Sequence, residues 1–201
     1  MRLGILASHH GTNFQAVIDA CQCGNLAAEV AVAISNNSQS GALVRARAAN
    51  IPTVHLSSRT HPQAEALDEA LLSALTDHQV DLVVMLGYMK KLGSRTLQHF
   101  QGRIINIHPS LLPKYGGQGM FGLNVHKAVL ESADTETGVT VHYADEHYDT
   151  GQMITQVRIQ VMPDDSPESL AARVLRQEHK LLVNTLKQLA ERPCNHQMKV
   201  R

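Results

Sequence analysis

Asn106 and His108 stand two residues apart in the segment IINIHPSLLPKY (residues 104–115), where an apolar run ends. Alternate residues of an extended strand point to one side, so the amide and the imidazole are predicted to project side by side. Pro109 restricts the residue before it to extended backbone, which fixes the direction of His108. Such a pair suits a carbonyl oxygen that gains negative charge. The alternative is a buried polar pair that bonds nearby main chain.

A second polar cluster is the turn HYADEHYDTG (residues 142–151), which closes on Asp149. An aspartate near an imidazole raises the pKa of the ring and orients it. A hairpin turn rich in Asp and Gly explains the same residues without any function. His142, Asp145 and His147 are also a candidate metal set, but their spacing matches no strong zinc signature, so we expect no metal.

Two loops that follow strands could hold ligands. In SHHGTNFQ (residues 8–15), Gly11, Thr12 and Asn13 open a helix whose N-terminal N–H groups could face a phosphate. An ordinary capped helix explains this stretch equally well. In GYMKKLG (residues 87–93), exposed main chain could hold a flat heterocycle while a lysine meets an anionic tail. A turn with solvated lysines is the alternative there.

Glu178 falls on the apolar stripe of the last predicted helix. A buried carboxylate needs a partner. That partner is either a cation at the helix edge or the amine or hydroxyl of a ligand.

Strand-like and helix-like runs alternate along the chain, which predicts βαβ units. Strands are expected at 3–7, 28–35, 53–56, 80–89, about 104–107, 138–145 and 153–162, and helices at 12–21, 41–49 and about 64–76. A last helix is expected from Pro167 to about Ala190, with Ser166 as its N-cap. The fold class is therefore α/β: a single doubly wound, mostly parallel sheet, Rossmann-like, with helices on both faces and antiparallel edge strands near the C-terminus. Ligands of such sheets bind beyond the carboxyl ends of the strands. Residues 1–190 are expected to form one domain, and residues 191–201 a mobile tail.

The composition excludes several classes of partner. Lys and Arg number 18, as do Asp and Glu, and Trp is absent, so neither nucleic acid nor an anionic membrane is indicated. Small-molecule substrates are expected instead, with the chain as a monomer or a homodimer. Cys21, Cys23 and Cys194 lack metal-type spacing and indicate reduced thiols, and no targeting segment is evident, so a cytoplasmic location is expected.

Taken together, the motifs resemble the glycinamide ribonucleotide formyltransferase family, folate-dependent enzymes of purine synthesis. The resemblance covers about residues 1–190. It rests on Gly11–Asn13, Gly87–Lys90, the run NIHPSLLPKY at 106–115, Asp149–Gly151 and QEH at 177–179.

The resemblance implies formyl transfer from 10-formyltetrahydrofolate, as co-substrate, to an amine through a tetrahedral intermediate. Asn106 and protonated His108 would stabilise the charge on its oxygen, and Asp149 would hold the imidazole charged near neutral pH. Other positions match binding segments of the family. These are Gly11, Thr12 and Asn13 with Glu178 for the acceptor and its phosphate, and Met89, Lys90, Lys91, Leu92, Asn106 and Asp145 for the folate.

The chain departs from its relatives at three places. Ser8-His9-His10-Gly11 replaces a more glycine-rich loop, an arginine that could face the folate tail is missing near Gln63, and the loop Gly116–Gly122 is longer. These changes leave open the acceptor, the affinity for the folate tail and whether residues 116–122 form an ordered lid. The alternatives are formyl transfer to another amine, such as an amino-sugar nucleotide, hydrolysis of formyltetrahydrofolate, and a non-enzymatic folate- or nucleotide-binding module. Hydrolases of this kind usually carry an N-terminal regulatory domain, and transfer-RNA formyltransferases a C-terminal RNA-binding domain.

Overall fold

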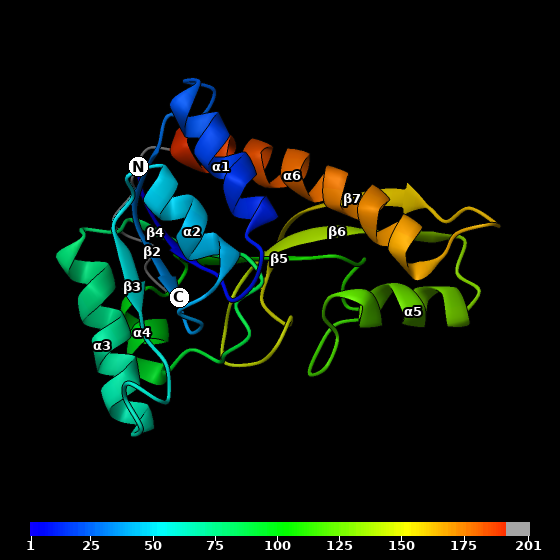
Figure 1. Cartoon of the computed structure of the whole chain (residues 1–201). Helices are drawn as coiled ribbons and strands as arrows, with labels where there is room; N and C mark the ends of the chain where they lie inside the picture. The colour runs from blue at the N-terminus through cyan, green and yellow to red at the C-terminus, as the bar shows by residue number, and fades with distance from the viewer. Residues whose placement is uncertain (192–201) are drawn as a thin grey trace, which may run out of the picture.

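The computed structural model describes residues 1–191, in which strands and helices alternate from the first residues onward (Figure 1). The strands are β1 (Arg2–Leu6), β2 (Glu29–Ser35), β3 (Thr53–His55), β4 (Leu82–Met85), β5 (Ile104–His108), β6 (Glu136–Tyr143) and β7 (Met153–Gln160). The helices are α1 (Thr12–Gln22), α2 (Gly41–Ala48), α3 (Ala64–Asp77), α4 (Ser94–His99), α5 (Leu123–Glu131) and α6 (Pro167–Glu191).

The strands form one seven-stranded sheet in the order β3-β2-β1-β4-β5-β6-β7. Strands β1 to β5 pair in parallel, whereas β6 runs antiparallel to both β5 and β7. The chain order reverses between β1 and β4, as expected of a doubly wound sheet. The predicted fold class is therefore confirmed, including its antiparallel strands near the C-terminus.

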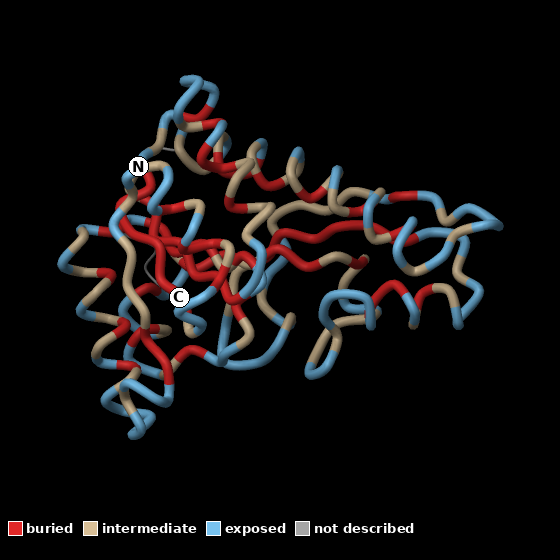
Figure 2. Tube along the Cα trace, in the orientation of Figure 1, coloured by how far each residue is buried: buried red, intermediate tan, exposed pale blue. Residues whose placement is uncertain are grey.

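Each face of the sheet is buried against a different set of helices. In β1 and β5, odd-numbered residues such as Leu3, Ile5 and Ile105 join a core with α1, α2, α5 and α6. Even-numbered residues of the same two strands, such as Leu6 and Ile104, join a second core with α3 and with Phe100, which follows α4. Figure 2 shows the resulting band of buried backbone through the middle of the sheet. The alternation matters for the site, because Asn106 and His108 are even-numbered too.

Helix α6 begins as predicted. The N–H of Ser169 donates to Oγ of Ser166 at 3.1 Å, and Pro167 occupies the first helical position, where a missing N–H costs nothing. Its buried stripe includes Leu170, Val174, Leu182 and Leu186. The helix continues to Glu191, one residue into the expected tail, and residues 192–201 of that tail lie outside the described part of the chain. Within residues 1–191, no helix is long and apolar enough to cross a membrane.

Two features of the fold differ from the predicted elements. Strand β4 covers only Leu82–Met85 of the predicted 80–89, and Gly87, at φ 69°, turns the chain away from the sheet. Helices α4 and α5 were not predicted. Helix α4 is short and depends on a distant residue, because the carboxylate of Asp68 in α3 accepts from the N–H groups of Arg95 and Thr96. No local pattern reveals such a cap.

Candidate functional site

The polar residues of β5 lie opposite polar residues of β6. In the antiparallel register Asn106 faces His142 and His108 faces Thr140. These four side chains lie on the face of the sheet that holds the second core. Their apolar neighbours in the strands, such as Ile107 and Val141, lie on the opposite face and belong to the first core. The end of β5 is thus apolar toward α5 and α6 and polar on its other side.

Asp149 joins these residues from the β6–β7 loop. Its Oδ1 accepts from the amide of Asn106 at 3.3 Å, and its Oδ2 lies 3.5 Å from Nδ1 of His108. Gly117 fixes the carboxylate further, since its main-chain N–H donates to Oδ2 at 2.9 Å. Gly151 lets the loop approach β6, because a Cβ there would lie 1.8 Å from the carbonyl oxygen of Tyr143. Sequence positions more than 40 apart therefore meet at one carboxylate.

The hydrogen-bond network assigns the tautomers of both histidines. Nδ1 of His142 donates to the carbonyl oxygen of Tyr143 at 2.8 Å, so its Nε2 can accept from the amide of Asn106 at 3.1 Å. Nε2 of His108 donates to the carbonyl oxygen of Tyr115 at 2.8 Å. In its neutral form His108 therefore presents an unprotonated Nδ1 to Asp149.

The two ionisable groups at the centre of the site have shifted pKa values. Burial lowers the pKa of His108 below 6.5 and outweighs the carboxylate of Asp149 and the carbonyl of Tyr115, which both raise it. Burial raises the pKa of Asp149, but the ring of His142, whose Nε2 lies 3.5 Å from Oδ1, the ring of His108 and the N–H of Gly117 together hold that pKa below its ordinary value. The expectation that Asp149 keeps His108 charged near neutral pH is therefore wrong for the free protein, because burial of the side chain, 5% exposed, lowers the pKa of His108 more than the carboxylate raises it.

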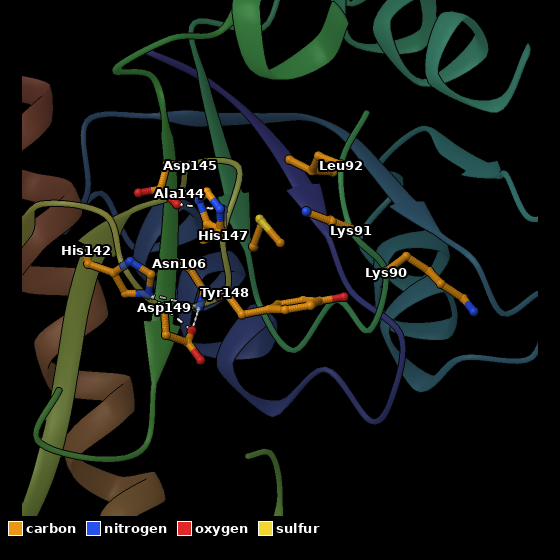
Figure 3. Close-up of a pocket in the computed structure, with 11 residues that line it drawn as sticks. Lys90, Lys91, Leu92, Asn106, His142, Ala144, Asp145, His147, Tyr148 and Asp149 are labelled. Carbon is orange, nitrogen blue, oxygen red and sulfur yellow. Dashed lines mark hydrogen bonds and ion pairs between the residues drawn. The ribbon is translucent and has the colours of Figure 1, made fainter. Parts of the chain in front are cut away.

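A pocket opens beside this cluster, between the β6–β7 loop and the segment after β4 (Figure 3). Tyr148, about half exposed, reaches across it from the loop toward Lys90 and Lys91. The lining residues are Met85, Lys90, Lys91, Leu92, Asn106, His142, Ala144, Asp145, His147, Tyr148 and Asp149. Five of the six residues predicted to bind folate are among them. The sixth, Met89, is not among them; its N–H donates to Oγ of Ser8.

Asp145 has a structural task in this loop. Its Oδ1 accepts from the N–H of His147 at 2.8 Å and from the hydroxyl of Thr150 at 2.9 Å, as in the turn interpretation. His142 is committed to Asn106 and Tyr143 instead. In residues 1–191, no group of three or more His, Cys, Asp or Glu side chains is arranged to hold a metal ion.

The loop between β1 and α1 lies next to the segment after β4. Ser8 connects them: its N–H donates to the carbonyl of Gly87 at 3.2 Å, and its Oγ accepts from the N–H of Met89 at 2.8 Å. Gly11 precedes α1 at φ 73°, and within the described chain no side chain caps this helix. The first N–H groups of α1 are therefore available to an anionic ligand.

Glu178 reaches the same loop from α6. It is 8% exposed, and within residues 1–191 no cation lies within ion-pair distance of it, so the salt-bridge interpretation fails. Burial raises the pKa of Glu178 to about 7, and a hydrogen bond with Asn13 only partly opposes this. Oδ1 of Asn13 is itself buried without a partner in the described structure. Both side chains are thus suited to a ligand that supplies donors.

Three residues of the site were missed as binding or positioning groups. His142 was weighed only as a ring beside a carboxylate or a metal ligand, although its register opposite Asn106 follows once β5 and β6 are paired. Tyr115 acts through its main chain, which leaves no signal in the sequence. Tyr148 was predictable in principle, as an aromatic residue in a turn next to Asp149.

Comparison with known proteins gives consistent similarities. Residues 1–186 match the family model described as Formyl transferase. The phosphoribosylglycinamide formyltransferase of Haemophilus influenzae is 38% identical over 190 residues, which cover 94% of this chain and 87% of that protein. The chloroplastic phosphoribosylglycinamide formyltransferase of Arabidopsis thaliana is 37% identical over 191 residues, which cover 94% of this chain but 65% of that protein. A crystal structure of the phosphoribosylglycinamide formyltransferase from Bacillus halodurans has a TM-score of 0.89 and 35% identity, with 96% of each chain covered.

Proposed function

The chain belongs to the formyl transferase family, and we propose on that basis that it transfers a formyl group from 10-formyltetrahydrofolate to the amine of glycinamide ribonucleotide in purine biosynthesis. The named relatives support this acceptor, since the H. influenzae protein is 38% identical over 94% of the chain. The observation that carries the chemistry is Asp149, whose carboxylate contacts both Asn106 and His108 at the edge of a pocket.

The donor is placed in the pocket that Tyr148 crosses. Main chain at Lys90–Leu92 would hold the pterin ring, and Lys90 or Lys91 would meet the anionic tail, in place of the arginine missing near Gln63. All three residues of the segment line the pocket, which supports this assignment. The formyl group would then lie against Asn106 and Asp149 at the inner wall.

The acceptor is placed on the β1–α1 loop. Its phosphate would bind the open N–H groups of Gly11, Thr12 and Asn13, and its glycinamide part would donate to Asn13 and Glu178. The unpartnered Oδ1 of Asn13 and the burial of Glu178 without a cation support this orientation. Because Ser8 bonds the loop to Met89, the amine would approach the formyl carbon from the neighbouring loop.

In the reaction, the amine nitrogen attacks the formyl carbon and the carbonyl oxygen becomes negatively charged. The amide of Asn106 exchanges its 3.3 Å contact with Asp149 for this oxygen. The attacking amine gives up a proton, which Nδ1 of neutral His108 accepts beside the carboxylate of Asp149, directly or through a bound water. The same proton then passes to N10 of the folate as the N10–carbon bond breaks, leaving tetrahydrofolate and the formylated amine. A histidine whose pKa is below 6.5 can carry out both transfers at neutral pH.

The function is tested by incubating the purified protein with 10-formyltetrahydrofolate, with and without glycinamide ribonucleotide. We expect tetrahydrofolate and formylglycinamide ribonucleotide to appear in equal amounts, measured by absorbance and mass spectrometry. Release of formate at the same rate without the amine would contradict the proposal and support a hydrolase. A cytoplasmic location and a monomeric or dimeric state stay predictions.

A further inference from the structure

Tyr115 has an unusual backbone for a large side chain. Its φ is 59°, in the left-handed region that favours glycine, and it immediately precedes the long loop 116–122. A residue is held in such a conformation only when its surroundings determine it strongly. The contacts of Tyr115 therefore indicate what this conformation is for.

The main chain at residues 115–117 holds both members of the proton-transfer pair. The carbonyl oxygen of Tyr115 accepts from Nε2 of His108 at 2.8 Å, and the N–H of Gly117 donates to Oδ2 of Asp149 at 2.9 Å. The first contact fixes the tautomer of His108 and leaves Nδ1 facing Asp149 at 3.5 Å. A rotation of the 115–116 peptide would remove that acceptor from the ring.

The side chain of Tyr115 is tied to the turn between α5 and β6. Its hydroxyl donates to Oδ2 of Asp134 at 2.7 Å. Nζ of Lys114 donates to both oxygens of Asp134, at 2.7 and 2.6 Å, which orients the carboxylate. Hydrogen bonds from Lys114 and Tyr115 hold the pKa of Asp134 below its ordinary value, so it accepts over the whole neutral range. Asp134 thus fixes the aromatic end of the residue whose carbonyl meets His108.

We propose that Asp134 is a positioning residue for His108, acting through Tyr115, whose left-handed backbone it maintains. The expected effects on kcat rest on the proposed formyl transfer, whereas the expected effect on the His108 ring does not. Other groups that face His108 are Asp149 from the β6–β7 loop, His142 from β6 and His126 from α5. None of these three residues contacts Asp134 in the described hydrogen-bond network. The effect of Asp134 on His108 can therefore be separated from their effects.

The test compares Tyr115→Phe, Asp134→Ala and the double variant with wild-type protein. Each single change should lower kcat about tenfold, which corresponds to 1.4 kcal/mol, with KM for both substrates within about twofold. The double variant should be no worse than either single one, because all three remove the same hydrogen bond. Asp134→Asn, which keeps an acceptor oxygen, should recover most of the activity. Glu136→Gln is the control, since it removes an exposed ion pair with Arg158 on the next strand.

A second measurement needs no substrate. Nitrogen-15 NMR of the histidine rings should show that Tyr115→Phe lowers the pKa of His108, because a carbonyl that raises it is displaced. The acidic limb of the kcat profile should move to lower pH by the same amount, since the ring loses its proton earlier. An unchanged ring pKa, or additive losses of kcat, would overturn the inference. Failure of the wild-type protein to transfer formyl groups would instead overturn the proposed function and leave the NMR result intact.

Discussion

Asn106 commits both hydrogens of its amide in the free protein, one to His142 at 3.1 Å and one to Asp149 at 3.3 Å. The longer bond is the one that a developing oxyanion can replace, while His142 keeps the amide oriented. The histidine is in turn fixed by the carbonyl of Tyr143. Orientation by neighbours is what allows a single amide to act as a preorganised donor.

Replacing Asn106 with Ala should lower kcat by about 10²–10³ and leave the melting temperature nearly unchanged, because one oxyanion donor is lost from a partly exposed position. Steady-state kinetics at saturating donor and acceptor measure this effect. A variant that turns over at nearly the wild-type rate would show that Asn106 does not contact the reacting oxygen.

The buried carboxylate of Glu178 lowers the stability of the folded protein when it is charged, and a bound ligand that donates to it would offset this cost. Its pKa is about 7 in the folded protein against 4.5 ordinarily, so between these values the folded state binds the extra proton. Stability from this group is present below pH 4.5 and is lost as the pH rises to 7. The shift corresponds to about 3 kcal/mol at pH 8.

Glu178→Gln should therefore have a higher free energy of unfolding than wild-type protein at pH 8, by up to about 3 kcal/mol. Urea denaturation measures this difference, which should be smaller at pH 5. At the same time KM for the acceptor should rise about tenfold with KM for the donor unchanged, since a charged partner is lost. Glu168→Gln, on the exposed first turn of the same helix, serves as the control. Equal stability of the Gln variant and wild-type protein at pH 8 would refute a buried carboxylate that costs stability when it is charged.

At the scale of elements, the site is built where strands end and loops begin. In the proposed function, the loop after β1 would bind the acceptor, the segment after β4 would bind the donor, and the end of β5 with the β6–β7 loop would supply the catalytic groups. Ser8 connects the first two, and the carboxylate of Asp149 connects the loop 116–122 to β5. The contribution of the β1–α1 loop can be tested by replacing Gly11.

Gly11→Ala should destabilise the protein by more than the roughly 1–2 kcal/mol expected for a side chain in left-handed backbone, because its Cβ would lie 2.8 Å from Cα of Ala42. KM for the acceptor should also rise, since the start of α1 shifts. Gly24→Ala is a matched control: its φ is 72°, and nothing lies within 4 Å of its Cβ. Thermal melts and kinetics of both variants would show whether the two differ. Equal effects would mean that the packing of the β1–α1 loop against α2 does not matter.

Elements were predictable where the pattern is local and long. The parallel strands, the amphipathic α6 and its Ser166 cap all follow from spacing and end signals, and the structure has them within a few residues. Helix α5 was missed although Val125 and Val129 have helical spacing, because a glycine-rich loop precedes it. Helix α4 was not predictable, since its cap is Asp68, more than 20 residues away.

The same limit applies to the site. Strand periodicity was sufficient to place Asn106 and His108 together, and the resemblance to a family named Asp149. The protonation of His108 was not predictable, because it depends on burial and on the carbonyl of Tyr115. Contacts made through main chain, and pKa shifts caused by burial, exist only after folding.

At the scale of the whole molecule, the central claim is that two substrates meet between neighbouring loops of one sheet and that glycinamide ribonucleotide is the acceptor. The direct measurement is kcat/KM for tetrahydrofolate formation with glycinamide ribonucleotide, with an amino-sugar nucleotide and with water alone. We expect glycinamide ribonucleotide to exceed both others by at least about a hundredfold, because Asn13 and Glu178 would bind its glycinamide part, which the others lack. A higher kcat/KM for the amino-sugar nucleotide, or equal formyl release without any amine, would contradict the account.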